Sequence, residues 1–431
     1  MKHREFAVVA SDGWFDGERH VAGPVTLRVA NGKIAEIGAG DHARVMAAWG
    51  LTVHRGAFLM PGLVDAHVHL FLDGGPTDGP SRSAHMKKSV EELSEAARAG
   101  ARQALAHGVT LVRDAGDKHG INHLVRDEAH AAGKGLCRVR SGGSGIKRAK
   151  RYGAFMAGDV GDDESIRESV SQLAAANDEI KIILTGIIDF DAGGVTDEPQ
   201  FTLDESRLIV ETARRHGRQT FAHCSGEKGL AIAAQAGVGS IEHGFFMDRE
   251  TLAIMRDNQV AWTPTFSPVH FQWAQPQAVG WSANTIGHLR RILDSHAEHL
   301  RLAHAMGVPL LLGTDAGSMG VEHGKALYEE IQRYQEAGLP LAATLQAATA
   351  SPRQHFGLPA KLAVGAPFEA NLLSASPFSQ LAALRQPVKT WLAAAHPAPQ
   401  AASEQVRGDS RAAAGLFGRP PRHPPEPKTH H

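Results

Sequence analysis

The feature that most constrains the fold is a repeated alternation of short apolar runs and longer helical stretches between about residues 60 and 357. Eight runs rich in β-branched residues end in Gly, Asp, His or Ser, and Ala-, Glu- and Arg-rich segments with helical periodicity lie between them. The runs cover residues 63–69, 108–116, 136–143, 179–186, 218–224, 239–244, 260–266 and 308–317. Strands that alternate with helices favour a parallel sheet, and eight such units are the number that closes a (β/α)8 barrel.

An open doubly wound sheet is the alternative, and in many such sheets a Gly-x-Gly-x-x-Gly turn follows the first strand. No such turn follows residues 63–69. We therefore predict an α/β protein whose main domain is a (β/α)8 TIM barrel over residues 61–357.

The two ends of the chain differ from this central part. Residues 1–60 and 358–395 contain short strand-like runs, and Asp-Gly and Asn-Gly turns punctuate those of the first segment. Such patterns are typical of hairpins, and we expect the two segments to combine into one small β-sandwich domain beside the barrel. Residues 396–431 are rich in Ala, Pro and Arg without hydrophobic periodicity, which predicts a disordered tail.

The charge balance argues against several classes of protein. A formal net charge of -1, with 21% charged residues, gives no electrostatic reason to bind nucleic acid or an anionic membrane. The sequence has no apolar run of membrane-spanning length, and its polar N-terminus does not resemble a signal peptide. We predict a cytoplasmic protein that acts on a small-molecule substrate, as a monomer or a homo-oligomer. Cys137 and Cys224, its two cysteines, cannot form a Cys-rich zinc site.

The first strand-like run, LVDAHVHL, ends in two histidines one residue apart, His67 and His69. Residues two apart in a strand face the same side, so both imidazoles project together with Asp65. Neutral imidazoles are common metal ligands, but a His-x-His pair alone is weak evidence because structural and surface pairs also occur. Asp65 either supports the histidines or fills the lower layer of the barrel.

Four further runs carry residues of metal-site type, namely Lys181 in the fourth, His223 in the fifth, His243 in the sixth and Asp315 in the eighth. Active sites of (β/α)8 barrels lie at the C-terminal ends of the strands, so these side chains should converge with the two histidines of the first run. Taken singly, each histidine fits a hydrogen-bonded core residue, and Asp315 fits a helix cap. Lys181 is unusual, because lysine in an apolar strand is costly unless it is paired or chemically altered. The whole set predicts a metal centre.

The same residues lie in stretches that resemble the amidohydrolase superfamily of metal-dependent hydrolases. The stretches are MPGLVDAHVH, GVTLVRDAG, IKIILTG, FAHCSGEKGLAIAAQAGVGSIEHG, TPTF and GTDAG followed by EHG, in this order over most of residues 5–395. The imidazolonepropionase-like and prolidase-like branch, which includes dipeptidases and other amide-bond hydrolases, is the most similar. The resemblance implies a distorted (β/α)8 TIM barrel with a small β-sandwich formed by both chain ends.

Carried over residue by residue, the resemblance also implies a binuclear centre of two divalent metal ions, usually zinc. His67, His69 and Asp315 would hold one ion, His223 and His243 the other, and Lys181 would bridge both as a carbamate formed with CO2 (N6-carboxylysine). The implied reaction is hydrolysis of a C–N bond in an amide, peptide or carbamate by a metal-bridging hydroxide, with Asp315 as general base. The chain departs from many relatives in having Cys-Ser-Gly after His223, which leaves the substrate contacts of that loop in doubt.

A basic group follows the third run, on the side of the barrel where substrates bind. It comprises Lys147, Arg148, Lys150 and Arg151, with Tyr152 beside it, and His323 follows the eighth run. Guanidinium and ammonium groups bind carboxylates, so we predict a carboxylate-bearing substrate such as a dipeptide or an N-acyl amino acid. Its contacts would be Lys147, Arg148, Arg151, Tyr152 and His323. The competing interpretation is a solvated helix start and an uncharged substrate such as a urea or a carbamate.

Two other functions remain open at the level of the sequence. A mononuclear deaminase of the same superfamily generally lacks the strand-four lysine and has a Glu near the strand-five histidine. Glu227, four residues after His223, is a trace of that pattern, whereas Lys181 favours the binuclear hydrolase. The third function is a non-catalytic metal-binding protein, against which a full ligand set with a candidate base argues.

Overall fold

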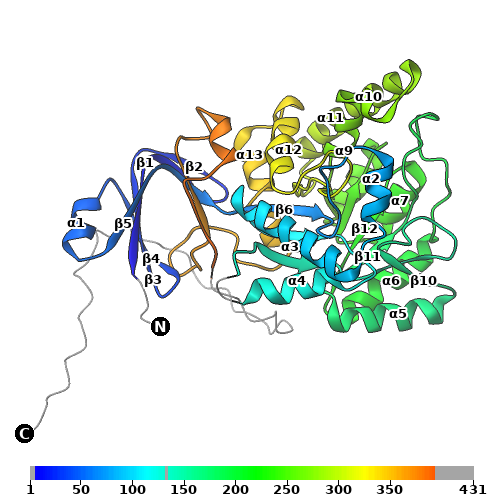
Figure 1. The fold of residues 1–431 in the computed structure, drawn as a ribbon, viewed down its shortest axis with the longest axis horizontal. Helices are drawn as coiled ribbons and strands as arrows, with labels where there is room; N and C mark the ends of the chain where they lie inside the picture. Colours follow the sequence, from blue (N-terminus) through cyan, green and yellow to red (C-terminus); the bar gives the residue numbers. More distant parts are fainter. Residues whose placement is uncertain (1–4, 132–133, 394–431) are drawn as a thin grey trace, which may run out of the picture.

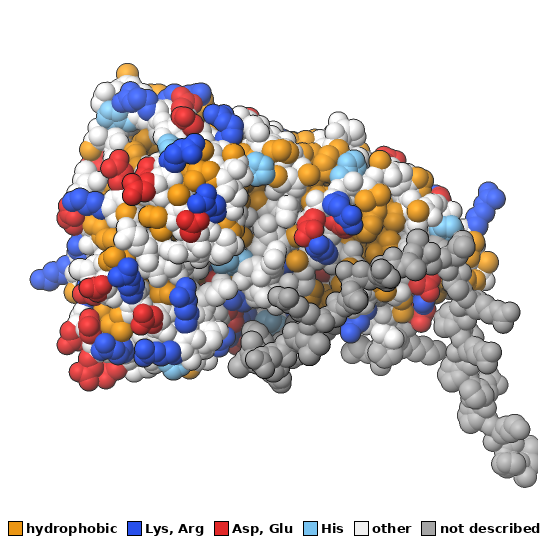
Figure 2. Space-filling view, turned by 180° about the vertical axis from the view of Figure 1, so that it is seen from behind, with side chains coloured by type: hydrophobic (Ala, Val, Ile, Leu, Met, Phe, Trp, Pro, Cys, Tyr) orange, Lys and Arg blue, Asp and Glu red, His pale blue; other side chains and the backbone are white. Residues whose placement is uncertain are grey.

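The computed structural model describes residues 5–131 and 134–393, which form a large α/β body with a smaller β-rich part at one side (Figure 1). The tail predicted to be disordered, residues 396–431, lies outside the described residues. None of the helices in the described part of the chain combines the length and the apolar character that a bilayer span requires. On the face that Figure 2 shows, Lys and Arg side chains are interspersed with Asp and Glu, as the near-zero net charge leads one to expect.

Parallel strands build the large body in two groups. The first sheet has the order β6-β7-β8, with β6 at Leu63–Val68, β7 at Val109–Asp114 and β8 at Arg138–Ser141. The second has the order β10-β9-β11-β12-β13-β14, with β9 at Gly145–Arg148, β10 at Ala157–Val160, β11 at Glu179–Ile183, β12 at Gln219–Cys224, β13 at Ser240–His243 and β14 at Ala261–Thr263. Seven of the eight predicted runs therefore contain a strand.

The eighth run, residues 308–317, closes the barrel without forming a regular strand. The amide of Leu311 donates to the carbonyl of Trp262 in β14 (2.9 Å), and the amide of Ala66 in β6 donates to the carbonyl of Leu312 (2.9 Å). The amide of Asp315 donates to the carbonyl of His67 (2.7 Å). The segment thus lies between β14 and β6, which is the position of an eighth strand.

The barrel is distorted between its third and fourth strands. The amide of Asp178, just before β11, donates to the carbonyl of Ser141 in β8 (2.9 Å), so the two strands meet only at their ends. The short strands β9 and β10 were not predicted, and they extend the second sheet there, with β9 pairing to β11 at Ile146 and Ile182. The segment predicted to be a basic loop is therefore partly a strand.

Helices cover the outside of the barrel (Figure 1). The longer ones are α3 at Val90–Ala106, α4 at Ile121–His130, α5 at Asp163–Ala176, α6 at Leu203–Arg215, α7 at Glu227–Ala236, α8 at Arg249–Asp257, α11 at Ala283–Met306 and α12 at Lys325–Glu336. Shorter ones are α1 at Ala43–Ala48, α2 at Gly79–His85, α9 at Ser267–Ala274, α10 at Pro276–Val279, α13 at Leu341–Ala347, α14 at Ala350–His355 and the 3-10 helix η1 at Leu381–Arg385. Local sequence sets several starts: Ser89 with Glu92, and Thr202 with Glu205, form capping boxes that satisfy the first free amides of α3 and α6.

Strands from both chain ends form one seven-stranded sheet with its own hydrophobic core. The strands are β1 at Phe6–Phe15, β2 at His20–Ala22, β3 at Val25–Ala30, β4 at Lys33–Ala39, β5 at Thr52–Pro61, β15 at Ala370–Leu373 and β16 at Lys389–Trp391. Strand β5 pairs with β1 on one side and with β15 on the other. Gly62 alone separates β5 from β6, and a Cβ there would lie 2.2 Å from Oγ1 of Thr110, so the passage into the barrel requires glycine.

Candidate active site

All six predicted metal-site residues are brought together at one end of the barrel. His67 lies in β6 and His69 directly after it, Lys181 lies in β11, His223 in β12 and His243 at the end of β13, and Asp315 lies near the end of the eighth run. His67 and Lys181 are fully buried, at 0% exposure. The expected convergence at the C-terminal strand ends is therefore seen.

The side chains of His67, His69 and Asp315 form a compact group. The Nε2 atoms of His67 and His69 each lie 3.6 Å from Oδ1 of Asp315. One ligand atom from each of the three residues fits within 4.8 Å of the others, a spacing that suits a single cation.

Two more histidines adjoin this group. The ring centroids of His223 and His243 are 4.6 Å apart, and those of His67 and His243 are 4.9 Å apart. Four imidazoles thus share one buried volume. Burial lowers the pKa of His69 and of His223 to about 3, so the rings are neutral and their free nitrogens can act as ligands.

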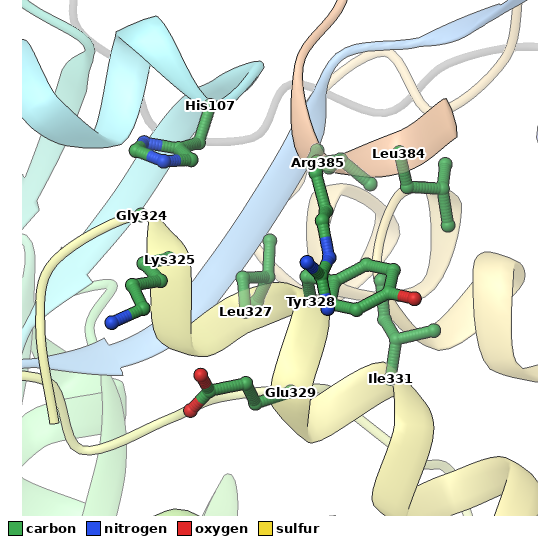
Figure 3. Close-up of a pocket in the computed structure, with 10 residues that line it drawn as sticks. His107, Gly324, Lys325, Leu327, Tyr328, Glu329, Ile331, Leu384 and Arg385 are labelled. Carbon is green, nitrogen blue, oxygen red and sulfur yellow. The ribbon is translucent and has the colours of Figure 1, made fainter. Parts of the chain in front are cut away.

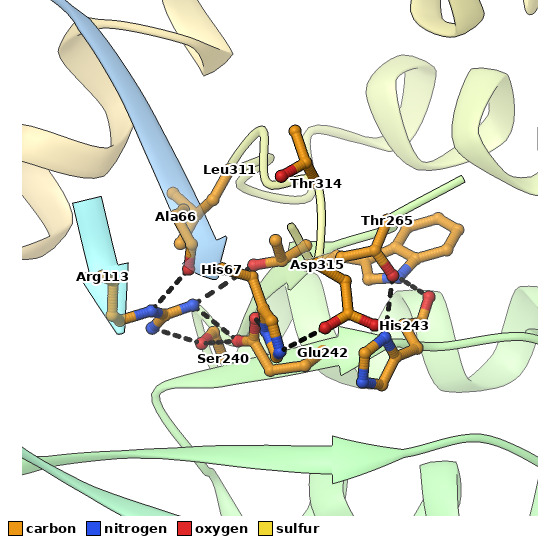
Figure 4. Close-up of polar contacts among 12 residues, drawn as sticks. Ala66, His67, Arg113, Ser240, Glu242, His243, Thr265, Leu311, Thr314 and Asp315 are labelled. Carbon is orange, nitrogen blue, oxygen red and sulfur yellow. Dashed lines mark hydrogen bonds and ion pairs between the residues drawn. The ribbon is translucent and has the colours of Figure 1, made fainter. Parts of the chain in front are cut away.

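Outer partners set the orientation of three of the rings. Nδ1 of His67 donates to Oε2 of Glu242 (2.7 Å), and Nδ1 of His69 donates to the carbonyl of Gly116 (3.2 Å). Nδ1 of His243 shares a hydrogen bond with Oγ1 of Thr265 (2.8 Å; Figure 4). Because a carboxylate and a carbonyl can only accept, the Nε2 atoms of His67 and His69 keep their lone pairs for the site.

Lys181 is the least expected side chain in this interior. Its Nζ is buried without a hydrogen-bond partner among the described residues, and it lies 4.8 Å from the ring centroid of Phe221. Burial lowers the pKa of the amine to about 8, so an uncharged fraction exists at neutral pH. The Nε2 atom of His67 is also buried without a hydrogen bond. Two polar atoms without hydrogen bonds in one buried volume fit a site that receives a cation.

A buried charge network beneath His67 was missed in the sequence analysis (Figure 4). Arg113 in β7 is fully buried, and its Nη2 donates to Oε1 of Glu242 (2.7 Å), the carboxylate whose other oxygen accepts from His67. The guanidinium also donates to the carbonyl of Ala66 (2.7 Å) and to Ser240 (3.0 Å). A charged residue within an apolar strand, the signal that identified Lys181, was also present in TLVRD and SIEH.

Asp65 supports the segment that carries the candidate base. Its carboxylate accepts hydrogen bonds from the amide of Thr314 (3.0 Å) and from its hydroxyl (2.6 Å). Asp65 in β6 therefore holds Thr314, the residue before Asp315, in the neighbouring eighth run. Ser318 donates to Oδ2 of Asp315 (3.0 Å), and burial raises the pKa of Asp315 to about 7.

Left-handed backbone conformations cluster at this site. Asp315 has φ of 59°, His243 of 70° and Thr265 of 49°. Residues other than glycine rarely adopt such angles, and they persist where the surrounding structure holds them, often at functional sites. The three residues either line the site or bond directly to a ring in it.

A cavity of about 250 Å³ opens onto the six-residue group, lined by Asp315, His223 and His243. The apolar part of its wall comprises Ile187, Ile188, Phe190, Phe245, Val269 and Met319. Arg82 and Tyr152 also line it. A small organic molecule with apolar groups suits this space.

Comparison with known protein families shows which family contains this chain. The family model of the amidohydrolase family matches residues 58–396. The chain belongs to the amidohydrolase family. The predicted imidazolonepropionase-like and prolidase-like branch is confirmed by matches of both kinds. The family acts on carbon–nitrogen bonds and relies on divalent metal ions, so this amidohydrolase is a metal-dependent hydrolase of amide bonds.

Individual relatives agree with this assignment. An uncharacterized protein of Mycobacterium tuberculosis is 29% identical over 308 residues, 72% of this chain and 77% of that protein. The ochratoxinase of Aspergillus niger is 28% identical over 302 residues, 62% of this chain and 60% of that enzyme. Its crystal structure matches with a TM-score of 0.76 over 91% of this chain and 95% of that one, at 21% identity. A Xaa-Pro dipeptidase structure matches with a TM-score of 0.75 over 89% and 97%, at 22% identity. The predicted fold class is thereby confirmed.

Of the substrate contacts predicted for this amidohydrolase, only Tyr152 lines the cavity. Lys147 lies on β9, and its ammonium bonds Oδ1 of Asp159 (2.5 Å). Arg148 pairs with Glu205, and Arg151 donates to the carbonyl of Glu198. His323 is buried, and its Nε2 bonds the carbonyl of Leu72 (3.0 Å). These four residues do not line the cavity, because nearby carboxylates and carbonyls hold their side chains elsewhere.

Two other features of the amidohydrolase stand apart from the site. Glu227, the residue that kept a deaminase open, is exposed at the start of α7 and does not line the cavity. A second cavity of about 340 Å³ lies between α12 and η1, where Tyr328 stacks under Arg385 (Figure 3). None of the six predicted metal-site residues lines that second cavity, so it is separate from the candidate active site.

Proposed function

We propose that this amidohydrolase is a binuclear enzyme that hydrolyses a C–N bond of a small carboxylate-bearing substrate in the cytoplasm. His67, His69 and Asp315 would hold one divalent ion, with zinc as the expected metal, and His223 and His243 the other. Lys181 would join the two as N6-carboxylysine. The observation that carries this proposal is the buried amine of Lys181, which has no hydrogen-bond partner among the described residues.

Carboxylation of Lys181 follows from the state of its amine. Because burial lowers the pKa of Lys181 to about 8, part of the population is uncharged and can attack CO2. A bond forms between Nζ and the carbon of CO2, one proton leaves, and the side chain becomes an anion. An anion in this buried volume requires positive charge beside it, and we infer two ions because His223 and His243 form a second pair of ligands beside the first group.

The residues around the ions divide the remaining work. When bound, the divalent ions lower the pKa of a water molecule to about 7 and polarise a substrate carbonyl. Asp315 accepts a proton from the attacking water through its carboxylate and passes it to the leaving nitrogen. Ser318 and the backbone bond to His67 hold Asp315 in place for both transfers.

The substrate class rests on two independent grounds. The apolar cavity contains one guanidinium, Arg82, which suits a small acid with an apolar side chain. A Xaa-Pro dipeptidase is among the similar structures, and a dipeptide carries a terminal carboxylate. We therefore propose a dipeptide or an N-acyl amino acid as the substrate. The basic group after the third run has no part in binding it.

Metal content tests the proposal directly. Elemental analysis of protein purified with zinc and bicarbonate should find two ions per chain, and chelation should abolish hydrolysis. Lys181→Ala should lower the metal content to about one ion per chain and reduce the activity by at least about 10²-fold. Lys361→Ala, at an exposed ion pair with Glu18, is the matched control and should change neither. One ion per chain in fully active wild-type protein would contradict the bridging role.

A further inference from the structure

We propose that Arg82 is the residue that binds the substrate carboxylate and so makes this amidohydrolase selective for acids over their neutral amides. The proposal rests on the proposed function, because it assigns the substrate-recognition group of the same cavity. Arg82 lies on α2, outside every sequence stretch that identified the metal site.

The position of the guanidinium is fixed before any ligand arrives. Nη1 of Arg82 donates to the backbone carbonyls of Asp73 (3.1 Å) and Pro76 (3.4 Å), and Nη2 donates to that of Gly317 (3.1 Å). Gly317 lies two residues after Asp315. The loop after β6 and the loop that carries the candidate base therefore hold Arg82 together, so binding costs little side-chain entropy.

The charge of Arg82 has no ion-pair partner in the described part of the chain, and Asp73 and Asp315 act on it only from beyond ion-pair distance. No Asp or Glu oxygen there lies within ion-pair distance, and all three hydrogen bonds go to neutral carbonyls. Five N–H groups belong to a guanidinium, so two remain for a ligand. A half-buried cation without a direct ion pair is costly, and a ligand carboxylate would supply that partner through two charge-assisted hydrogen bonds.

The surroundings select the kind of acid. Arg82 is the single Lys or Arg side chain among the described residues that line the cavity, whereas Lys147 and Arg148 are already paired with Asp159 and Glu205. Phe190 and Phe245 belong to the apolar part of the same wall. The fitting ligand is a small carboxylate with an aliphatic or aromatic group, on either side of the bond that breaks.

Binding and turnover test this assignment separately, both with the full-length, zinc-loaded protein. The binding probes are 3-phenylpropanoate and 3-phenylpropanamide, measured by titration calorimetry. Wild type should bind the acid at least about 10-fold more tightly than the amide, and Arg82→Ala should remove that preference. Arg82→Lys should restore part of it, because the charge returns without the planar fork. Arg167→Ala, at an exposed ion pair on α5, is the matched control and should bind as wild type does.

Turnover is measured with N-acetyl amino acids and dipeptides that have apolar side chains, each with its terminal amide. Arg82→Ala should lower kcat/KM for the acids by about 10-fold or more and leave the amides unchanged, with metal content as in wild type. A loss for acids and amides alike would indicate displacement of Asp315 and would overturn the assignment. Equal binding of the acid by wild type and Arg82→Ala, or no binding by wild type, would also overturn it. Arg82-dependent binding without hydrolysis of any probe would support Arg82 and contradict the proposed function alone.

Discussion

Asp315→Asn is expected to lower hydrolysis by at least about 10²-fold, since it removes the group that moves the proton while keeping the shape of the side chain. The fold should survive the change. Asp315 has φ of 59°, and Asn is one of the few residues that tolerates this conformation. Steady-state kinetics with a hydrolysable acid, together with circular dichroism, would measure both outcomes.

The amide of Asn is also a poorer metal ligand than a carboxylate, so metal content must be measured on the same samples. Asp257→Asn, at the exposed end of α8, is the matched control and should keep full activity. Near-normal turnover by Asp315→Asn with two ions bound would mean that another group moves the proton. An alanine at this position is the less useful variant, because it adds backbone strain to the loss of the carboxylate.

Arg113→Met is expected to lower the free energy of unfolding by about 3–5 kcal/mol, which is the cost of leaving buried carboxylates without their cation. Arg113 is fully buried and donates to both Glu242 and Glu179. Its guanidinium also lies 4.5 Å from the ring centroid of Phe221, so truncation loses packing as well. Denaturant unfolding of the wild type and the variant at neutral pH would give the difference.

A partly exposed ion pair provides the contrast. Arg98 pairs with Glu128 at a site where both side chains are about a quarter exposed, and Arg98→Met should cost less than about 1 kcal/mol. If Arg113→Met cost no more than this control, Glu242 would have another source of compensation. In that event the network beneath His67 would contribute little to stability.

Much of the fold was predictable because strand periodicity and strand-end residues are local signals. The run LVDAHVHL became β6 with His67 inside it, and the alternation of runs and helices gave the barrel. The strands β9 and β10 were not predictable, since four residues in a Gly- and Lys-rich segment carry no distinct periodicity. What made them strands is tertiary pairing, of β9 with β11 and of β10 with β9.

The same distinction applies to the site. Lys181 was recognised as a charge inside an apolar strand, and equal attention to Arg113 and Glu242 would have identified the network under the histidines. Arg82 could not be identified in this way, because it is polar, lies on a short helix and reaches the cavity only through loop packing. The basic group after the third run misled for a related reason: a cluster of charges in a sequence does not state which carboxylates will neutralise them.

The sheet built from both chain ends imposes an order on biosynthesis. Strand β5 ends at Pro61, whereas its neighbour β15 begins at Ala370, so a ribosome adding roughly 5–20 residues per second needs about 15–60 s to supply the second after the first. During this interval one edge of β5 has no partner, and an unpaired strand edge invites association with other chains. The part of the protein that is translated first therefore completes its native pairing only after β15 has been made.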